Sequence, residues 1–329
     1  MDYYNQLLDF KAVAPIDTPN DSEIYADESD YSVASLTEAF NSLDLSFPIT
    51  HYEVCNALDG SYDNALILVI SDLHLSYKIK EDHFSYSFGS VKARIDLLLD
   101  LMNTYEPSHI VFLGDSFELW RHKFVKWRDI IETYRELFEP IFDSQIPVYF
   151  VRGESDQKIT KSEFVNILYS LQIRCDSSTV HFSDAVVLPL PHPREDDFIL
   201  LLHGHNLDEF YLKKSKKKLA RYCKCCYSKS NSSLMPQIEQ IPYNVNKKLD
   251  EPRLNSTKKC VGIIHGHDHS AAYSYFDSKK ILHGDSGSCS GTRNCCIVIK
   301  ETGNELQVLA AVNKFDQINT VNRSTHVLI

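Results

Sequence analysis

Short apolar runs, each followed by polar residues, recur along the chain from residue 66 onward. They are rich in β-branched and aromatic residues and have the length of buried strands; in order they read "LILVIS", "HIVFLGD", "PVYFV", "FILLLHG" and "VGIIHG". Apolar residues at helical spacing separate the first two runs, and a second helical pattern extends from Phe124 to Ile141. The alternation predicts an α/β fold, with further strands at "KKILHG", "CCIVIK" and "LQVLAAV".

Two segments depart from this pattern. The first 50 residues hold ten carboxylates and one base, Lys11, which is typical of a separate, partly disordered extension. Residues 206–259 form a basic segment rich in Ser and Asn without a strand signal, which indicates an insertion. We therefore expect an acidic extension at 1–50 and one domain at 51–329 that carries a basic insertion at about 206–259.

Composition and charge narrow the function. Acidic residues outnumber basic ones by 45 to 34, which argues against a general nucleic-acid binder. No apolar run approaches the roughly 20 residues that span a bilayer, and the N-terminus lacks the order of a secretory signal. Nine cysteines, several of them adjacent, fit reduced thiols better than a disulfide framework. These features predict a cytoplasmic protein.

Polar residues suited to binding metal follow five of the predicted strands. In open α/β sheets, ligands bind outside the carboxyl ends of the strands, so five such segments can converge on one site. The segments contain Asp72 and His74, Asp115 and Glu118, Glu154 and Asp156, His203 and His205, and His265, His267 and His269.

The residue types and their spacing favour a metal centre. Asp72 and His74 lie two residues apart on an extended segment, as do His267 and His269, so each pair projects toward one side. Carboxylate with imidazole suits zinc, manganese or iron, and one carboxylate can bridge two ions. A single histidine at a strand end is usually structural or solvated, but five polar segments that each follow an apolar run favour a shared site.

The order "SDLH", "GDSFELW", "GESD", "HGH" and "GHDH" resembles the calcineurin-like metallophosphoesterase family, over about Asn64 to Asn313. Within that family, "GDSFELW" and "LLHGHN" are most similar to the UDP-2,3-diacylglucosamine pyrophosphohydrolase branch. The resemblance implies a four-layer α/β sandwich, in which helices flank two mixed β-sheets, and two metal ions at the sheet edge.

The resemblance also implies a ligand set. It assigns the first ion to Asp72, His74 and His269, the second to His203 and His267, and the bridge between them to Asp115. Of these residues, Asp72, Asp115 and His203 would form the catalytic core. The expected cofactors are two divalent ions, with Mn²⁺ preferred and Zn²⁺, Fe²⁺ or Mg²⁺ as alternatives.

The third motif, "GESD", departs from the family pattern. The family places an Asn at the position of Glu154, and a His, or an Arg in the lipid branch, at the position of Ser155. A carboxylate still binds metal, but its extra negative charge should weaken Lewis acidity and phosphate attraction. Loss of the neighbouring cation should slow catalysis roughly 10²- to 10³-fold, by analogy with removing one oxyanion donor. We therefore expect a site that is slower or retuned rather than inactive.

Substrate contacts are expected from Ser155, from Arg194 in "LPHPRE", and from Lys213 and Lys217. The two lysines lie in residues 211–230, a stretch with eight bases and no acid. Such a stretch would bind a polyphosphate or an anionic membrane surface, and a solvated helix face or loop is the equally weighted alternative.

Three functions follow from these observations. The first is a dimetal phosphoesterase that uses metal-bound hydroxide to cleave a phosphodiester or pyrophosphate of a nucleotide-linked or other small phosphorylated substrate. The second is a binding or regulatory protein that keeps the fold without turnover. The third, a nuclease of the same superfamily, is disfavoured by the acidic composition.

Overall fold

A computed structural model of the chain describes thirteen stretches of residues. They are 54–56, 65–77, 91–119, 126–156, 158–190, 196–205, 235–250, 257–267, 272–276, 281–285, 293–302, 305–314 and 325–328. The predicted acidic extension and the basic residues Lys213 and Lys217 lie outside them.

The described elements alternate between strands and helices. The strands are β1 (Val54–Asn56), β2 (Leu66–Ile70), β3 (His109–Leu113), β4 (Val148–Val151), β5 (Val180–Ser183), β6 (Ala185–Pro189), β7 (Asp197–Leu202), β8 (Lys259–His265), β9 (Ala272–Phe276), β10 (Ile281–Asp285), β11 (Arg293–Thr302), β12 (Glu305–Lys314) and β13 (Thr325–Leu328). The helices are α4 (Val91–Tyr105), α5 (Trp127–Thr133), α6 (Arg135–Asp143), α7 (Lys161–Ser170) and α10 (Met235–Leu249), with a short 3-10 turn at Ser177–Thr179.

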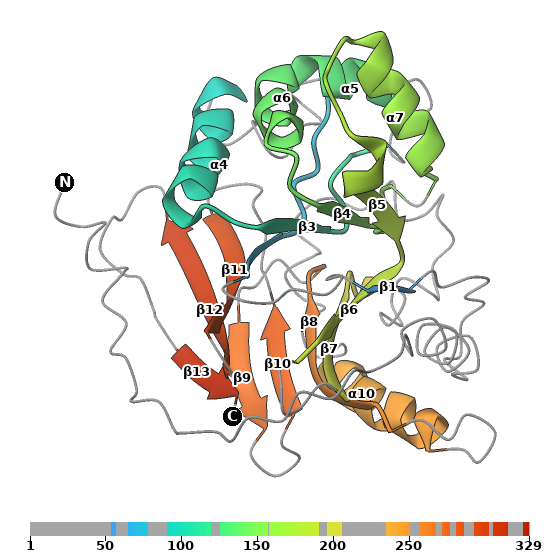
Figure 1. The fold of residues 1–329 in the computed structure, drawn as a ribbon, viewed down its shortest axis with the longest axis vertical. Coiled ribbons are helices and arrows are strands. Elements are labelled where there is room, and N and C mark those ends of the chain that lie inside the picture. The colour runs from blue at the N-terminus through green and yellow to red at the C-terminus, as the bar shows by residue number, and fades with distance from the viewer. Residues whose placement is uncertain are drawn as a thin grey trace, which may run out of the picture.

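These strands form two sheets with helices on their outer faces. The seven-stranded sheet has the order β13-β12-β11-β2-β3-β4-β5, and the six-stranded sheet has the order β1-β6-β7-β8-β10-β9. Helices α4 to α7 lie together over the seven-stranded sheet, whereas α10 lies beside β7 and β8 (Figure 1). Both sheets mix parallel and antiparallel pairs. The predicted fold class is confirmed.

Strands β2, β3 and β4 are parallel neighbours and are buried on both faces, which explains why their sequences are almost uninterrupted apolar runs. Successive side chains along a strand point to opposite faces, so Phe112 packs under the helices while Val111 and Leu113 pack against the second sheet. Apolar layers therefore hold these three strands from both sides. The polar residues predicted to bind metal follow directly where the strands end.

All eight predicted strands are present, but the helical pattern from Phe124 to Ile141 was misjudged as one helix. The described residues form two helices, α5 and α6, separated at Tyr134, whose backbone has a non-helical ψ of 25°. Both helices still bury their apolar faces, and Tyr134 is fully buried between them. The apolar spacing resembles that of one helix because the two helices are separated by a single residue and pack against the same core.

Helix α7 was not predicted, although its start carries a recognisable signal. Thr160 caps the helix by accepting a hydrogen bond from the backbone N–H of Glu163, at 3.3 Å. The Thr160 hydroxyl also donates to the Glu163 carboxylate, at 2.9 Å. A Thr followed three residues later by a Glu, before an apolar run, is a sequence signature of a helix start.

The segment expected to be an insertion contributes a helix to the domain. Helix α10 buries Ile241, Val245 and Leu249, and its Asn246 side chain bonds to the backbone of β8. The amide of Asn246 donates to the Cys260 carbonyl at 3.0 Å and accepts from the Cys260 N–H at 2.7 Å. The register between β7 and β8 shifts next to Cys260. Asn246 therefore supports β8 at the point where its hydrogen bonding with β7 is irregular. Among the described helices, none combines the length and apolar character needed to cross a bilayer.

Asn246→Ala should lower the free energy of unfolding by about 1 to 3 kcal/mol, because it removes both side-chain partners of the Cys260 backbone. Denaturant unfolding measures this loss, with Lys247→Ala, an exposed change on the same helix, as the control. Equal midpoints for the two variants would show that α10 is not anchored through Asn246.

Candidate metal centre

The polar residues predicted from the sequence meet where the two sheets share an edge. Five buried carboxylates follow strands of the seven-stranded sheet, and four buried histidines lie at or just after the ends of strands of the six-stranded sheet. The carboxylates are Asp72, Asp115, Glu118, Glu154 and Asp156, and the histidines are His203, His205, His265 and His267. A fifth buried histidine, His74, follows β2. Negative charge thus comes mainly from one sheet and imidazole nitrogen mainly from the other.

Backbone hydrogen bonds tie these loops to one another beyond the ends of the strands. The N–H of Asp72 donates to the Gly114 carbonyl at 3.0 Å, and the N–H of His74 donates to the Asp115 carbonyl at 2.8 Å. In the second sheet, the N–H of Gly266 donates to the His203 carbonyl at 3.3 Å. The His267 N–H crosses between the sheets to the Asp72 carboxylate, at 3.0 Å.

Four of the predicted ligand residues have positive φ, in the left-handed region that side chains with a Cβ rarely adopt. The angles are 54° for Asp72, 49° for His74, 50° for Asp115 and 77° for His267. Each such residue costs of order 1 kcal/mol or more and persists only where its surroundings hold it. Strain gathered at the ends of several strands is typical of a functional site.

Two glycines allow the carboxylates and imidazoles to come this close. Gly114 has a φ of 85°, and a Cβ there would overlap the His203 ring. A Cβ on Gly153 would overlap the carboxylate and backbone nitrogen of Asp115. Both glycines of "LGD" and "RGESD" are therefore required by packing at the site.

Asp115 occupies the middle of the cluster. Its Oδ2 lies 3.6 Å from Nε2 of His74, and its Oδ1 lies 3.6 Å from Nε2 of His203. Both imidazole nitrogens also lie 3.9 Å from Oδ1 of Asp72. These separations are too long for hydrogen bonds. Two ligand atoms that each lie about 2.1 Å from one ion are about 3.0 to 3.5 Å apart, so the observed spacing is close to that of a shared cation.

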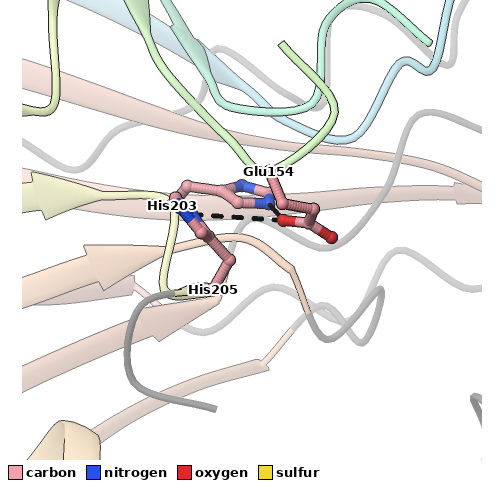
Figure 2. Close-up of side chains that lie close together, drawn as sticks. All are labelled: Glu154, His203 and His205. Carbon is pink, nitrogen blue, oxygen red and sulfur yellow. Dashed lines mark hydrogen bonds and ion pairs between the residues drawn. The ribbon is translucent and has the colours of Figure 1, made fainter. Parts of the chain in front are cut away.

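Glu154 lies among three imidazoles. Its Oε2 is 3.0 Å from Nε2 of His203 and 4.0 Å from Nδ1 of His205, and its Oε1 is 3.4 Å from Nδ1 of His267. Figure 2 shows Glu154 reaching from the turn after β4 toward His203 and His205 on the segment after β7. The Glu154 carboxylate therefore contacts the histidines of the opposite sheet.

Hydrogen bonds orient the two histidines that face Asp115. His74 Nδ1 donates to the Glu118 carboxylate at 2.9 Å, which directs Nε2 toward Asp72 and Asp115. His203 Nδ1 lies 2.9 Å from the Leu113 carbonyl, which can only accept, so Nδ1 carries the proton. The Nε2 of each ring is the nitrogen that points into the cluster. Partners of this kind usually fix the tautomer of a metal-binding histidine.

The carboxylates shift the ionisation of these histidines. Burial by itself would lower the pKa of His203, but the charges of Asp115 and Asp72 raise the pKa to about 10. Burial opposes ionisation of His74 as well, and the hydrogen bond to Glu118 raises its pKa to about 9. Without a metal ion, protons on these imidazoles therefore neutralise part of the carboxylate charge.

The pKa values of the Asp115 and Glu154 carboxylates are shifted in opposite directions. Burial and the charge of Glu154 raise the pKa of Asp115 well above its usual value. Burial would also raise the pKa of Glu154, but the imidazoles of His267 and His203 hold the pKa well below its usual value. The ionised form of Asp115 is thus disfavoured by burial and by the neighbouring Glu154 carboxylate, and a bound cation would stabilise it.

The donor set fits divalent ions. Asp72, Asp115 and His203 each offer one ligand atom, and these atoms lie within 4.8 Å of one another. Glu154, His203 and His205 form a second such group with the same limit. The first group is rich in carboxylate oxygen and the second in imidazole nitrogen, and both are donor types that zinc, manganese and iron accept.

The structure shows the contacts of two further residues from the sequence pattern, Ser155 and Asp156, whereas two other predicted residues lie outside its described part. Ser155, expected to face substrate, is buried and donates its hydroxyl to Asp115 Oδ2 at 2.9 Å. The Asp156 carboxylate accepts from the backbone N–H groups of Ser116 and Gly153, at 2.8 and 2.6 Å, and so braces the loops. His269 and Arg194 lie outside the described residues.

The sequence left the roles of two residues open. His205 is among the residues suited to binding metal, but the ligand set implied by the resemblance omits it, and the fold places it beside Glu154. Glu118 is also a candidate ligand, and in the fold its carboxylate accepts a hydrogen bond from His74 Nδ1 and so orients that ring. Whether such a residue serves as a ligand or orients a neighbouring ligand depends on its distances to residues in other loops, which the sequence does not give.

Residues 65–271, well over half of the chain, match the sequence profile described as calcineurin-like phosphoesterase. The chain belongs to the calcineurin-like phosphoesterase family. Family members use divalent metals, in agreement with the candidate ligand groups at the shared edge. Among curated proteins, no sequence matches the chain.

Solved structures with a similar fold include two forms of Vps29 and a phosphatase. Vacuolar Protein Sorting 29 from Cryptosporidium parvum has 13% identity and a TM-score of 0.41, over 81% of this chain and 98% of its own. Vps29 from Chaetomium thermophilum has 14% identity and a TM-score of 0.38, over 80% and 96%. A dimetal phosphatase from Danio rerio has 12% identity and a TM-score of 0.40, over 74% and 95%. None of these resemblances assigns an activity to this chain.

Metal binding should release protons. At pH 7 the raised pKa values of about 9 for His74 and about 10 for His203 keep both imidazoles protonated in the metal-free protein. Both protons must leave before the rings can bind an ion, so Mn²⁺ affinity should rise steeply with pH, and this dependence should fade above the two pKa values. Calorimetric titration in buffers of different ionisation enthalpy should give at least about two protons released per protein at pH 7, because Asp115, whose pKa is also raised, adds to the release of the two histidines. A proton count near zero would contradict this arrangement.

Proposed function

We propose that this protein is a dimetal phosphoesterase that hydrolyses a phosphodiester or pyrophosphate bond in a small phosphorylated substrate. The observation that carries the proposal is the placement of Asp115, whose two carboxylate oxygens each face a different histidine, at 3.6 Å in both cases. A carboxylate so placed is suited to bridge two ions. Membership of the phosphoesterase family supports the reaction class.

The residues of the chain have distinct tasks in this proposal. Asp72, His74, His269 and Asp115 would hold one ion. Asp115, Glu154, His203 and His267 would hold the other, with His205 beside them. Divalent ions at such a site polarise phosphoryl oxygens and lower the pKa of water. Glu118 and the Leu113 carbonyl keep the imidazoles in the tautomer that can bind metal. Burial of the whole cluster strengthens its electrostatic interactions.

The finer features of the substrate rest on the sequence. "GDSFELW" and "LLHGHN" support the UDP-2,3-diacylglucosamine pyrophosphohydrolase branch, and hence a nucleotide-linked substrate with a pyrophosphate. In this proposal Arg194, Lys213 and Lys217 would contact its phosphates, and the basic stretch that holds the two lysines would meet an anionic membrane surface. Manganese is the proposed ion, because carboxylate and imidazole ligands together suit it.

A binding or regulatory function without turnover is the second candidate, and the contacts of Glu154 favour it. The family's neutral amide is replaced by a carboxylate that contacts three imidazoles, which makes the site one charge less attractive to phosphate. Turnover of a chromogenic phosphodiester by the manganese-loaded protein distinguishes the two functions. Two bound ions with no hydrolysis above that of free manganese would favour the binding function.

Asp115→Asn should reduce the bound metal by more than one ion, because each oxygen of the native carboxylate faces a different ligand histidine. Phosphodiester hydrolysis should fall at least 100-fold, on the order of the loss of one electrostatic stabiliser. Metal content after dialysis and the hydrolysis rate are the measurements, and Asp96→Asn, an exposed change on α4, is the control. A variant that retains two ions with native affinity would show that Asp115 is no bridge.

Glu154→Asn should raise phosphodiester hydrolysis roughly tenfold, because it restores one unit of positive charge around the substrate phosphate. Glu154→Gln is the matched comparison, since it removes the charge at constant side-chain length. Rates should be measured beside metal content. If both variants keep two ions and hydrolyse no faster than the native protein, Glu154 does not limit the rate.

A further inference from the structure

The Asp115 carboxylate is held by one residue of the opposite loop. The backbone N–H of Ser155 donates to Oδ1, and the Ser155 hydroxyl donates to Oδ2, both at 2.9 Å. Ser155 is buried, with 3% of its surface exposed, so water competes little for these bonds. Both oxygens of the carboxylate therefore receive a donor from the same residue.

Each oxygen of Asp115 also faces a different histidine. Oδ1, which accepts from the Ser155 N–H, lies 3.6 Å from Nε2 of His203. Oδ2, which accepts from the Ser155 hydroxyl, lies 3.6 Å from Nε2 of His74. A carboxylate oxygen has two lone pairs, so each can accept one Ser155 bond and still present a lone pair to a cation beside its histidine.

We propose that Ser155 is a positioning residue that fixes the rotation of the Asp115 carboxylate, so that one oxygen serves the His74 side and the other serves the His203 side. The inference rests on the proposed dimetal function. The terminal torsion of an aspartate is broad, and two donors at a fixed separation remove that freedom. The serine in "GESD" therefore builds the metal bridge, rather than meeting the substrate as the family's cation would.

The position of Ser155 is itself fixed by its neighbours. A Cβ on Gly153 would overlap Asp115, so the turn packs directly against the carboxylate. Asp156 accepts from the backbone N–H groups of Ser116 and Gly153, which joins the turn to the loop that carries Asp115. The Leu119 N–H adds a bond to the Ser155 carbonyl at 3.3 Å. The donors thus belong to a rigid frame.

The two donors of Ser155 can be separated by mutation, which makes the proposal testable. Ser155→Ala removes the hydroxyl bond to Oδ2 and keeps the N–H bond to Oδ1. The ion position beside His74 should therefore weaken, while the position beside His203 should change little. A loss of general stability would weaken both positions alike.

The experiment is Mn²⁺ titration, followed by calorimetry, of Ser155→Ala in three backgrounds: the native chain, His74→Ala and His203→Ala. In the His203→Ala background, where the His74 position remains, the dissociation constant should rise roughly 10- to 100-fold, the range for one hydrogen bond to a charged group. In the His74→Ala background it should rise less than about threefold. Ser155→Thr keeps a hydroxyl and should restore native affinity.

Ser183→Ala is the matched control, because Ser183 is a fully buried serine whose hydroxyl has no hydrogen-bond partner among the described residues. It should leave both affinities unchanged, and thermal unfolding of each metal-free variant verifies folding. Two results would overturn the role of Ser155 but leave the dimetal function standing. One is equal weakening of Mn²⁺ binding in the two histidine backgrounds. The other is native affinity in Ser155→Ala while the native chain binds two ions. A native chain that binds no Mn²⁺ would overturn the dimetal function together with this inference.

Discussion

Five carboxylates buried at one edge of the two sheets impose the constraint on which the rest of the site depends. An ionised carboxylate away from water is costly unless hydrogen bonds or positive charge compensate it. The second sheet compensates three of them, because histidines at the ends of β7 and β8 reach Glu154, Asp72 and Asp115. Glu118 instead pairs with His74, and Asp156 accepts hydrogen bonds from backbone N–H groups. The pairing of the two sheets therefore sets the charge balance around Asp72, Asp115 and Glu154, and so the chemistry of the site depends on it.

The backbone at this edge is conformationally strained, and the strain is distributed over several loops. Predicted ligands such as Asp72 and Asp115 have positive φ, and Gly114 gives the His203 ring the space that a Cβ would fill. Hydrogen bonds between the loops after β2 and β3 extend beyond the strands and hold these conformations. Apolar layers on both sides of β2, β3 and β4 supply the rigid support. A strained but fully buried edge is thus compatible with a stable fold.

The third motif acquires a different meaning once its contacts are known. From the sequence alone, "GESD" is expected to weaken the site, because a carboxylate and a serine stand where the resemblance implies an amide and a cation. In the fold, its four residues face two ways: Glu154 contacts the histidines of the opposite sheet, while Gly153, Ser155 and Asp156 fasten the Asp115 loop. The motif therefore contributes both to the electrostatics of the site and to its construction.

The sequence by itself determined the strands that carry the site and the residue types at their ends. Period and composition suffice for this, because a strand buried on both faces must be apolar throughout and a polar residue then marks its end. The same reasoning misjudged the break at Tyr134 and missed the helix that docks on β8 through Asn246, because both depend on partners distant in sequence. Only the tertiary structure decided that Glu118 orients His74, that His205 lies beside Glu154, and that Ser155 holds Asp115. The physical reason is that a carboxylate, an imidazole or a hydroxyl can act as ligand, donor or brace, and the choice depends on distances of about 3 to 4 Å between loops that chain order does not specify.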